Sequence, residues 1–240
     1  METRIDEIAD GVFRLSTFVP DANIMFNQFV VRDDEPLLFH TGPRALFPLV
    51  SDAVSRIVPI DTMRWITFGH VEADECGSMN SFLAAAPDAT VAHGALGCMV
   101  QVDDLADRPP RPLGGGEVIA LGNRRVLNID TPHIPHAWDA HVLYEEVTRT
   151  LFCGDLFTRF GESDVLTSDD IVEAALAMEE FGAPTALTPA TAPTIRQLAD
   201  LEIDTLALMH GPSYKGDCGK ALLELAEGYA QMFTDASVQG

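Results

Sequence analysis

One short stretch of the sequence carries a histidine and two carboxylates on alternate positions. His70, Glu72 and Asp74 follow the apolar run 65–68, whose aromatic and β-branched content is typical of a short buried strand. If the backbone stays extended beyond Gly69, these three side chains point to the same side. Acidic runs are usually solvated loops, but a solvated loop does not require a histidine in a two-residue period. The stretch therefore predicts a metal-binding loop.

Three further candidate ligands also come directly after strand-like runs. They are His136 in a loop that contains Thr-Pro, Asp155 in a Gly-Asp step, and His210 in a His-Gly step. Loops that follow neighbouring strands gather at one rim of a sheet. Together with the first loop and the adjacent Glu75, they offer three histidines and three or four carboxylates. That set is large enough for two metal ions that share a bridging carboxylate.

The spacing of the cysteines is not that of a zinc knuckle or a redox dithiol. Cys76, Cys98, Cys153 and Cys218 lie far apart and form no C-x-x-C pair. We expect most of them to be buried thiols of a reducing compartment.

The charge of the chain excludes several classes of partner. It has 37 acidic and 15 basic residues and a net charge of −22, which repels phosphate backbones and anionic lipid. We therefore expect no nucleic-acid partner. No apolar run approaches the roughly 18 residues that a membrane span needs, and the N-terminus lacks a basic segment followed by an apolar one. We expect a soluble, cytoplasmic protein with no membrane association.

The apolar pattern predicts strands and helices in two successive groups. Expected strands cover residues 11–19, 26–32, 37–39, 65–68, 90–92, 117–120, 125–129, 141–144, 150–153 and 205–209. Expected helices cover residues 44–57, 78–86, 95–105, 169–181, 190–201 and 218–233. The Pro- and Gly-rich stretch 108–116 is predicted to be irregular and to connect the two halves of the chain. Two such halves are expected to meet face to face with their helices outside.

The order of these motifs resembles a known family. His-x-Glu-x-Asp, a histidine in a Thr-Pro loop, Gly-Asp after a strand and a strand-ending His-Gly are similar to the metallo-β-lactamase superfamily. More narrowly, the chain resembles the diiron domain of flavodiiron proteins and their stand-alone oxygen-binding relatives, over almost all of residues 5–235. The resemblance implies an α/β (α+β) fold, a four-layer αββα sandwich, formed as one domain over residues 1–240. It also implies a homodimer.

The resemblance assigns ligands residue by residue. It makes His70, Glu72 and His136 the ligands of a first metal, Asp74 and His210 those of a second, and Asp155 the bridge. Hydrolytic members of the superfamily carry histidine where Glu72 stands. His136 is preferred to His133 because its three-residue step to Asp139 matches the family better.

The carboxylates of Glu72, Asp74 and Asp155 favour iron over zinc. Their three negative charges, set against the four positive charges of two divalent ions, leave the cluster near +1. Anionic oxygen donors stabilise a ferric pair, whereas neutral histidines suit zinc. We expect two Fe ions, with Zn or Mn as alternatives.

Glu75 departs from the flavodiiron pattern, which has histidine there. It is expected to bind the second metal, to hydrogen-bond a bound water, or to turn away and leave an open coordination position.

The expected function is that of a non-haem diiron protein that binds dioxygen or nitric oxide, as a sensor or as a partner-dependent reductase. No phosphate-binding loop follows His210, so no flavin is expected in this chain. Electrons for turnover would come from a separate flavoprotein or a rubredoxin-like partner. Two alternatives stay open at this point. One is a binuclear metal-dependent hydrolase of thioesters or lactones, and the other is a scaffold that acts only through protein contacts.

Overall fold

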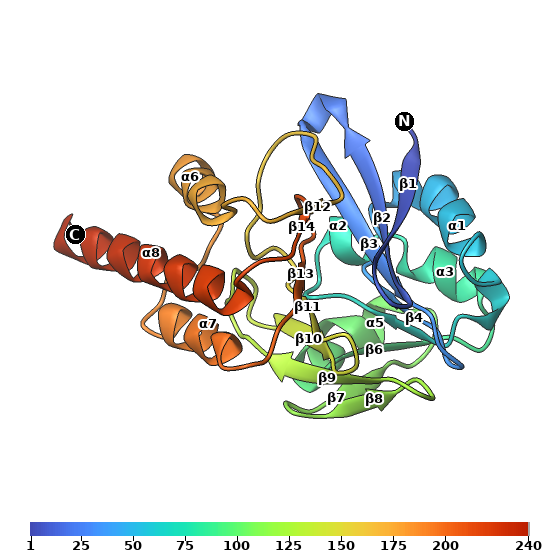
Figure 1. Cartoon of the computed structure of the whole chain (residues 1–240). Helices are drawn as coiled ribbons and strands as arrows, with labels where there is room; N and C mark the ends of the chain where they lie inside the picture. Colours follow the sequence, from blue (N-terminus) through green and yellow to red (C-terminus); the bar gives the residue numbers. More distant parts are fainter. Residues whose placement is uncertain (240) are drawn as a thin grey trace.

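Two seven-stranded sheets pack face to face in the computed structural model, and helices cover both outer faces (Figure 1). The structure describes residues 1–239, with side chains up to residue 236. This arrangement is the four-layer αββα sandwich that the resemblance implied. Each half of the chain builds one sheet and the helices on its outer face.

The first sheet contains its strands in chain order. They are β1 (Thr3–Ala9), β2 (Val12–Val19), β3 (Ile24–Val31), β4 (Leu37–Phe39), β5 (Trp65–Thr67), β6 (Thr90–Gly94) and β7 (Arg111–Leu113). Strands β1 to β4 are antiparallel neighbours, whereas β4 to β7 run parallel. Parallel neighbours need crossover connections, so helices lie between these later strands in the sequence.

The second sheet has the order β12-β14-β13-β11-β10-β9-β8. Its strands are β8 (Val118–Ala120), β9 (Arg125–Asp130), β10 (His141–Glu145), β11 (Thr150–Phe152), β12 (Leu166–Thr167), β13 (Thr205–Ala207) and β14 (Ser213–Tyr214). Strands β11 and β13 are parallel neighbours. The loops that follow them therefore leave the sheet at the same edge.

The helices form the two outer layers. In the first half they are α1 (Phe47–Ser55), α2 (Ala73–Cys76), α3 (Met79–Ala85), α4 (Ala95–Gly97) and α5 (Asp103–Leu105), with a π-helical segment (Cys98–Val102) between the last two. In the second half they are α6 (Val172–Gly182), α7 (Thr191–Ala199) and α8 (Cys218–Gln239). Short 3₁₀ turns cover Pro20–Ala22, Arg44–Leu46 and Ile60–Thr62. None of the helices within residues 1–239 has both the length and the apolar composition needed to cross a bilayer.

Three apolar layers hold the four structural layers together. One packs α1 and α3 on the first sheet, through Val50, Val54 and Phe82 among others. The second lies between the sheets and includes Phe29 and Phe152, whose rings meet edge to face at 5.5 Å. The third joins the second sheet to the C-terminal helices. Burial of these faces is the main favourable contribution to folding.

The structure corrects several expectations about local structure. The backbone does not stay extended through Asp74, because residues 73–76 form the single helical turn α2. The stretch 108–116 is not wholly irregular, since it contains β7. Proline is tolerated in β7 because this strand lies at the edge of its sheet, where an N–H group is not needed. The short strands β1, β12 and β14 were not expected from the pattern.

The start of α6 also differs from the prediction. The helix begins at Val172, and the expected acidic start lies just before it. The Asp170 carboxylate accepts a hydrogen bond from the backbone N–H of Val172 at 2.7 Å. Asp170 therefore supplies an acceptor for a free N–H group of the first turn.

Buried polar side chains of the first sheet hold a loop of the second. Asn27 donates through Nδ2 to the carbonyl oxygens of Leu208 and Gly211, both at 2.8 Å. Arg14, which is fully buried, donates to the carbonyl of Gly211 at 2.8 Å. These contacts fix residues 208–211 against β2 and β3, although nearly 200 positions separate the partners in sequence.

Replacing Asn27 with alanine removes both side-chain hydrogen bonds. The buried Leu208 carbonyl then lacks its side-chain donor, whereas the Gly211 carbonyl keeps the one from Arg14. We expect Asn27→Ala to lower the free energy of unfolding by about 2 kcal/mol, measured by urea denaturation. Asn80→Ala is the matched control, because its amide donates to the Leu105 carbonyl at the surface. Equal losses in both variants would contradict a special role for Asn27 in joining the sheets.

Candidate metal centre

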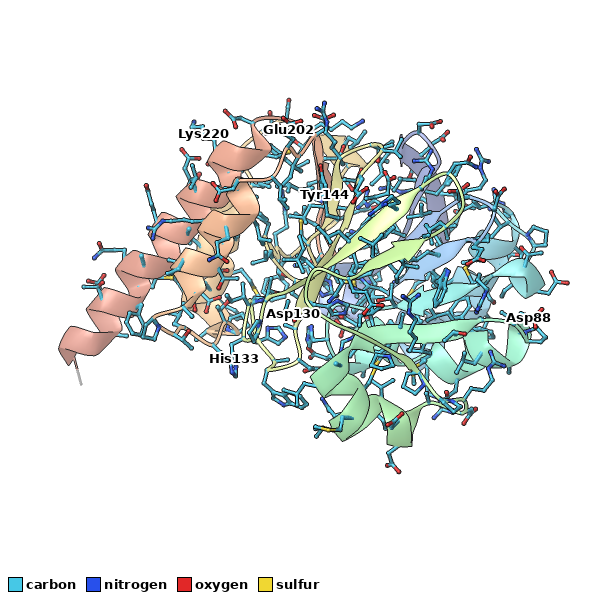
Figure 2. All side chains as sticks on the ribbon, turned by 90° about the horizontal axis from the view of Figure 1, so that it is seen from below. Asp88, Asp130, His133, Tyr144, Glu202 and Lys220 are labelled. Atoms are coloured by element: carbon cyan, nitrogen blue, oxygen red, sulfur yellow. The ribbon has the colours of Figure 1, made fainter. Side chains whose placement is uncertain are left out.

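Four segments converge at one edge of the sandwich, and each begins at the end of a strand. They are the turn after β5, the β9–β10 loop, and the segments after β11 and β13. Asp130 and His133, labelled in Figure 2, mark the β9–β10 loop between the sheets and the C-terminal helices. Strand ends therefore bring together side chains that are up to 140 positions apart, as the sequence predicted.

Four of the predicted residues form a first cluster. His70 Nε2 lies 2.7 Å from Glu72 Oε2, and His136 Nε2 lies 3.0 Å from the same oxygen. Asp155 Oδ2 is 3.4 Å from His136 Nε2 and 3.9 Å from His70 Nε2. One donor atom from each of the four residues lies within 4.8 Å of the others. Such a group can surround a single ion.

The other oxygen of Asp155 faces a second cluster. Asp155 Oδ1 is 3.3 Å from His210 Nε2, and Asp74 Oδ2 is 3.2 Å from the same nitrogen. Asp155 thus presents one carboxylate oxygen to each group. This is the arrangement that a bridging carboxylate requires.

The imidazole rings are oriented from behind. His210 Nδ1 lies 2.7 Å from the carbonyl oxygen of Met25, and His70 Nδ1 lies 3.2 Å from Glu75 Oε1. Both contacts leave Nε2 directed at the carboxylates in front. Carbonyl and carboxylate partners of this kind set the tautomer of a metal-binding histidine.

Glu75 lies on the far side of the His70 ring from the two clusters. Its Oε2 accepts a hydrogen bond from the backbone N–H of His70 at 2.6 Å, and its Oε1 is 3.4 Å from His40 Nε2. A Cβ atom at Gly69 would lie 3.1 Å from Oε2, so glycine there lets the carboxylate approach the backbone. Of the three roles expected for Glu75, this geometry is that of a side chain turned away from the centre.

A buried network supports the start of the first loop. Asp139 Oδ2 accepts a hydrogen bond from the backbone N–H of Val71 and lies 3.1 Å from His93 Nε2. His93 Nδ1 is in turn 2.9 Å from His141 Nε2. The sequence reasoning did not assign this role to Asp139 or His93. The only available signal was the short step between His136 and Asp139.

Mutual hydrogen bonds hold the carboxylates ionised. Contacts with His136 and His70 lower the pKa of Glu72 to about 2. Burial opposes the charge on Asp155, but its hydrogen bond with His210 and the surrounding imidazoles keep its pKa well below the usual range. These residues are anionic donors at any physiological pH.

The histidines are correspondingly basic. Burial disfavours the cation of His70, but the Glu75 charge and the hydrogen bonds with Glu72 and Glu75 raise its pKa to about 12. Burial also opposes the cation of His210, but hydrogen bonds with Asp155 and Asp74 raise its pKa to about 10. In the metal-free protein, the protons on His70 and His210 therefore balance the carboxylate charges that bound metal cations would otherwise balance.

The donor set fits two divalent cations. Three imidazoles and three carboxylates converge, and Asp74 Oδ1 is buried with no hydrogen-bond partner among the described residues. A buried carboxylate oxygen without a partner is costly, and a cation would compensate for it. Nitrogen and oxygen donors of this kind suit iron, manganese or zinc.

A cavity of about 160 Å³ opens directly over the two clusters. Its floor contains five of the predicted ligands: Glu72, Asp74, His136, Asp155 and His210. Another part of its lining comes from α6, α8 and the segment after α6, through residues that include Met178, Glu179, Thr185 and Tyr229. Sequence reasoning missed this part of the lining, because its residues read as an ordinary helical pattern.

Sequence comparisons find related proteins. The model of the family described as ODP family beta lactamase matches residues 24–211. Diflavin flavoprotein A 1 of Nostoc sp. is 24% identical over 198 residues, which are 78% of this chain and 33% of that protein. Diflavin flavoprotein A 3 of the same organism is 23% identical over 61% of this chain and 26% of its own length. The chain thus spans at most about a third of these curated relatives.

Solved structures share the fold. Rubredoxin oxygen:oxidoreductase from Desulfovibrio gigas superposes with a TM-score of 0.80 at 17% identity, over 96% of this chain and 62% of that chain. A 1–254 fragment of diflavin flavoprotein A 5 from Nostoc sp. gives 0.77 at 17% identity, over 99% and 98%. A metal-soaked flavodiiron core from Synechocystis sp. gives 0.77 at 21% identity, over 97% and 61%. At these identities the likeness establishes the architecture.

Metal binding is expected to release protons. At pH 7.5 the metal-free protein holds a proton on both His70 and His210, whose pKa values are about 12 and about 10. Because a metal ion accepts only the neutral imidazole, these protons must leave. We expect calorimetric titration with zinc, in two buffers of different ionisation enthalpy, to give at least two protons released per chain. Affinity should increase as the pH is raised from 6 to 9.

The raised pKa values of His70 and His210 make the stability of the metal-free fold decrease as the pH rises, whereas metal affinity increases. A pKa raised from the usual value near 6.5 stabilises the folded chain below that value, and this contribution is lost as the pH rises through about 10. Metal binding without proton release, or with an affinity that does not depend on pH, would contradict this electrostatic description.

Proposed function

The chain belongs to the family described as ODP family beta lactamase, and on that premise we propose that it is a non-haem diiron protein that binds dioxygen or nitric oxide. One observation carries the proposal. The Asp155 carboxylate lies between two groups of nitrogen and oxygen donors, with one oxygen toward each. A carboxylate-rich set of this kind favours an iron pair that changes oxidation state, and zinc has no such change.

The two proposed iron positions differ in their protein donors. His70, Glu72, His136 and Asp155 would hold the first ion, which gives it four protein residues. Asp74, His210 and Asp155 would hold the second, which gives it three. The second position therefore keeps more room for an external ligand from the cavity. We assign Glu75 the role of orienting His70 from behind, in place of direct coordination.

The chain's own residues define what the centre accepts. Iron, when bound, supplies the electrons that pass to dioxygen or nitric oxide. Glu72 and Asp155 hold negative charge on the centre, and Glu75 keeps the His70 ring in place. The cavity of about 160 Å³ is smaller than the roughly 300–1,000 Å³ typical of sites for drug-sized ligands. Its size favours a diatomic molecule with a few waters over a thioester or a lactone.

Electrons are proposed to arrive from a separate flavoprotein or rubredoxin-like donor if the protein turns over; otherwise it would act as a sensor. Support comes from the names of its relatives, which include a rubredoxin oxygen:oxidoreductase and diflavin flavoproteins. The four cysteines are free thiols, which supports a cytoplasmic location. A homodimer and a single domain over residues 1–240 stay predictions.

Anaerobic reconstitution with ferrous iron tests the proposal. We expect two iron ions per chain by elemental analysis and, after exposure to air, a near-ultraviolet absorption band from the oxidised pair. Asp155→Asn removes the anionic charge shared by both clusters, so it should reduce the iron content to one ion or fewer and abolish the band. Asp88→Asn, an exposed carboxylate far from the centre (Figure 2), is the control and should retain both. A wild-type protein that takes up no iron and binds zinc tightly would refute the proposal.

The contrast with hydrolytic relatives gives a second test. Glu72→His replaces an anionic donor with a neutral one and should shift the site toward zinc. We expect this variant to lose at least half of its bound iron in competition with equimolar zinc, and the zinc-loaded wild type to leave lactoylglutathione and acyl-lactones uncleaved. Rapid hydrolysis by the zinc-loaded wild type would support the binuclear hydrolase instead.

A further inference from the structure

The cavity wall that faces the two clusters carries three buried polar side chains. Glu179 lies on α6, Thr185 follows that helix, and Tyr229 lies on α8. Their exposed fractions are only 5%, 7% and 4%. All three line the same cavity as the predicted ligands. Neither the sequence motifs nor the proposed ligand set uses them.

Glu179 is tied to Thr185 by two hydrogen bonds. Its Oε1 accepts from the Thr185 backbone N–H at 3.1 Å, and its Oε2 accepts from the Thr185 hydroxyl at 2.6 Å. No ion pair to Glu179 is found among the described residues. Burial of a carboxylate is costly unless hydrogen bonds compensate. The two bonds therefore lock Thr185 in one orientation at the wall.

This orientation determines where the hydroxyl protons go. A threonine hydroxyl has one proton, and its 2.6 Å contact with Glu179 is far shorter than its 3.5 Å contact with Tyr229 OH. The hydroxyl of Thr158, which also lines the cavity, donates to the Asp155 carbonyl at 2.7 Å. Among the hydroxyls of the described cavity lining, Tyr229 alone keeps its proton available for a molecule inside.

Tyr229 also stays protonated. Burial, together with the negative charges of Glu179 and Asp155, raises the pKa of its hydroxyl to about 12. The other lining residues from this part of the chain include the apolar side chains of Ala175, Met178 and Pro184. Tyr229 is therefore a hydrogen-bond donor among largely apolar neighbours.

We propose that Tyr229 donates a hydrogen bond to the outer end of a small ligand bound at the metal centre, while the two Thr185 donors occupy Glu179 and keep this carboxylate from competing for the Tyr229 proton. This inference rests on the proposed function and deepens it, since it specifies the ligand class. The cavity would select small molecules or anions that have an acceptor atom at the end remote from the metals.

Azide provides a suitable probe, because it is small, anionic and carries an acceptor at its free end. We expect titration of the air-oxidised, iron-loaded protein with azide, followed by absorption, to show an about tenfold higher Kd for Tyr229→Phe, as one lost hydrogen bond to a charged ligand predicts. Tyr144→Phe is the matched control. Its hydroxyl donates to the Glu202 carbonyl at the surface (Figure 2), so its azide Kd should stay at the wild-type value.

Substitutions at Thr185 give a second, independent comparison. Thr185→Val keeps the shape but removes the hydroxyl that donates to Glu179 Oε2. This carboxylate oxygen can then compete for the Tyr229 proton, so the azide Kd should rise about threefold. Thr185→Ser retains the hydroxyl and should bind azide like the wild type. This pair decides the question if Tyr229→Phe does not fold. Iron content is measured for every variant.

The outcomes separate the two proposals. Wild-type azide affinity in Tyr229→Phe with two irons bound, or equal Kd values for Thr185→Val and Thr185→Ser, would overturn the role of Tyr229 and leave the diiron proposal intact. A wild-type protein that binds no iron would refute the diiron proposal, and the role of Tyr229 would fall with it.

Discussion

The site depends on the repulsion among three carboxylates held close together. Glu72, Asp74 and Asp155 repel one another unless positive charge compensates them, and this repulsion is screened least at Asp155, whose side chain is only 9% exposed. In the metal-free protein, protons on His70 and His210 supply that compensation. Two divalent cations would supply more of it and would satisfy the unpartnered Asp74 oxygen. The sandwich provides the rigid strand ends that keep these charges from moving apart.

Orientation is imposed by groups that never face the cavity. The Met25 carbonyl from the first sheet holds His210 of the second, and Asn27 and Arg14 hold the loop around it. Glu75 holds His70 in the same manner. The geometry of the centre therefore depends on how the two sheets pack, because its donors come from both sheets. Residues of the C-terminal helices, among them Glu179 and Tyr229, line the same cavity.

The sequence predicted which distant side chains converge better than it predicted some local structure. Alternating His70, Glu72 and Asp74 and the strand-ending Asp155 and His210 are local patterns, and the structure brings these residues together with His136. The four-layer fold followed from the two groups of strands and helices. The expected extended backbone at Asp74 was wrong, because the turn α2 depends on tertiary contacts that no local pattern records.

Other features were beyond sequence reasoning for the same physical cause. The side that Glu75 faces is decided by the approach of Gly69 and His40, and β7 forms only because β6 offers it an edge. Glu179 and Tyr229 belong to helices whose patterns show burial but not which groups they meet. The sequence indicated which side chains after strand ends could bind a metal. Tertiary packing determined which groups these side chains contact.

The central claim is that Asp155 bridges two ions. Anomalous diffraction from crystals of the anaerobically iron-loaded protein, recorded at the iron edge, tests it most directly. We predict two iron peaks about 4 Å apart, one beside each oxygen of Asp155, with Glu75 contacting neither. A single peak, or two peaks that do not share Asp155, would contradict this account.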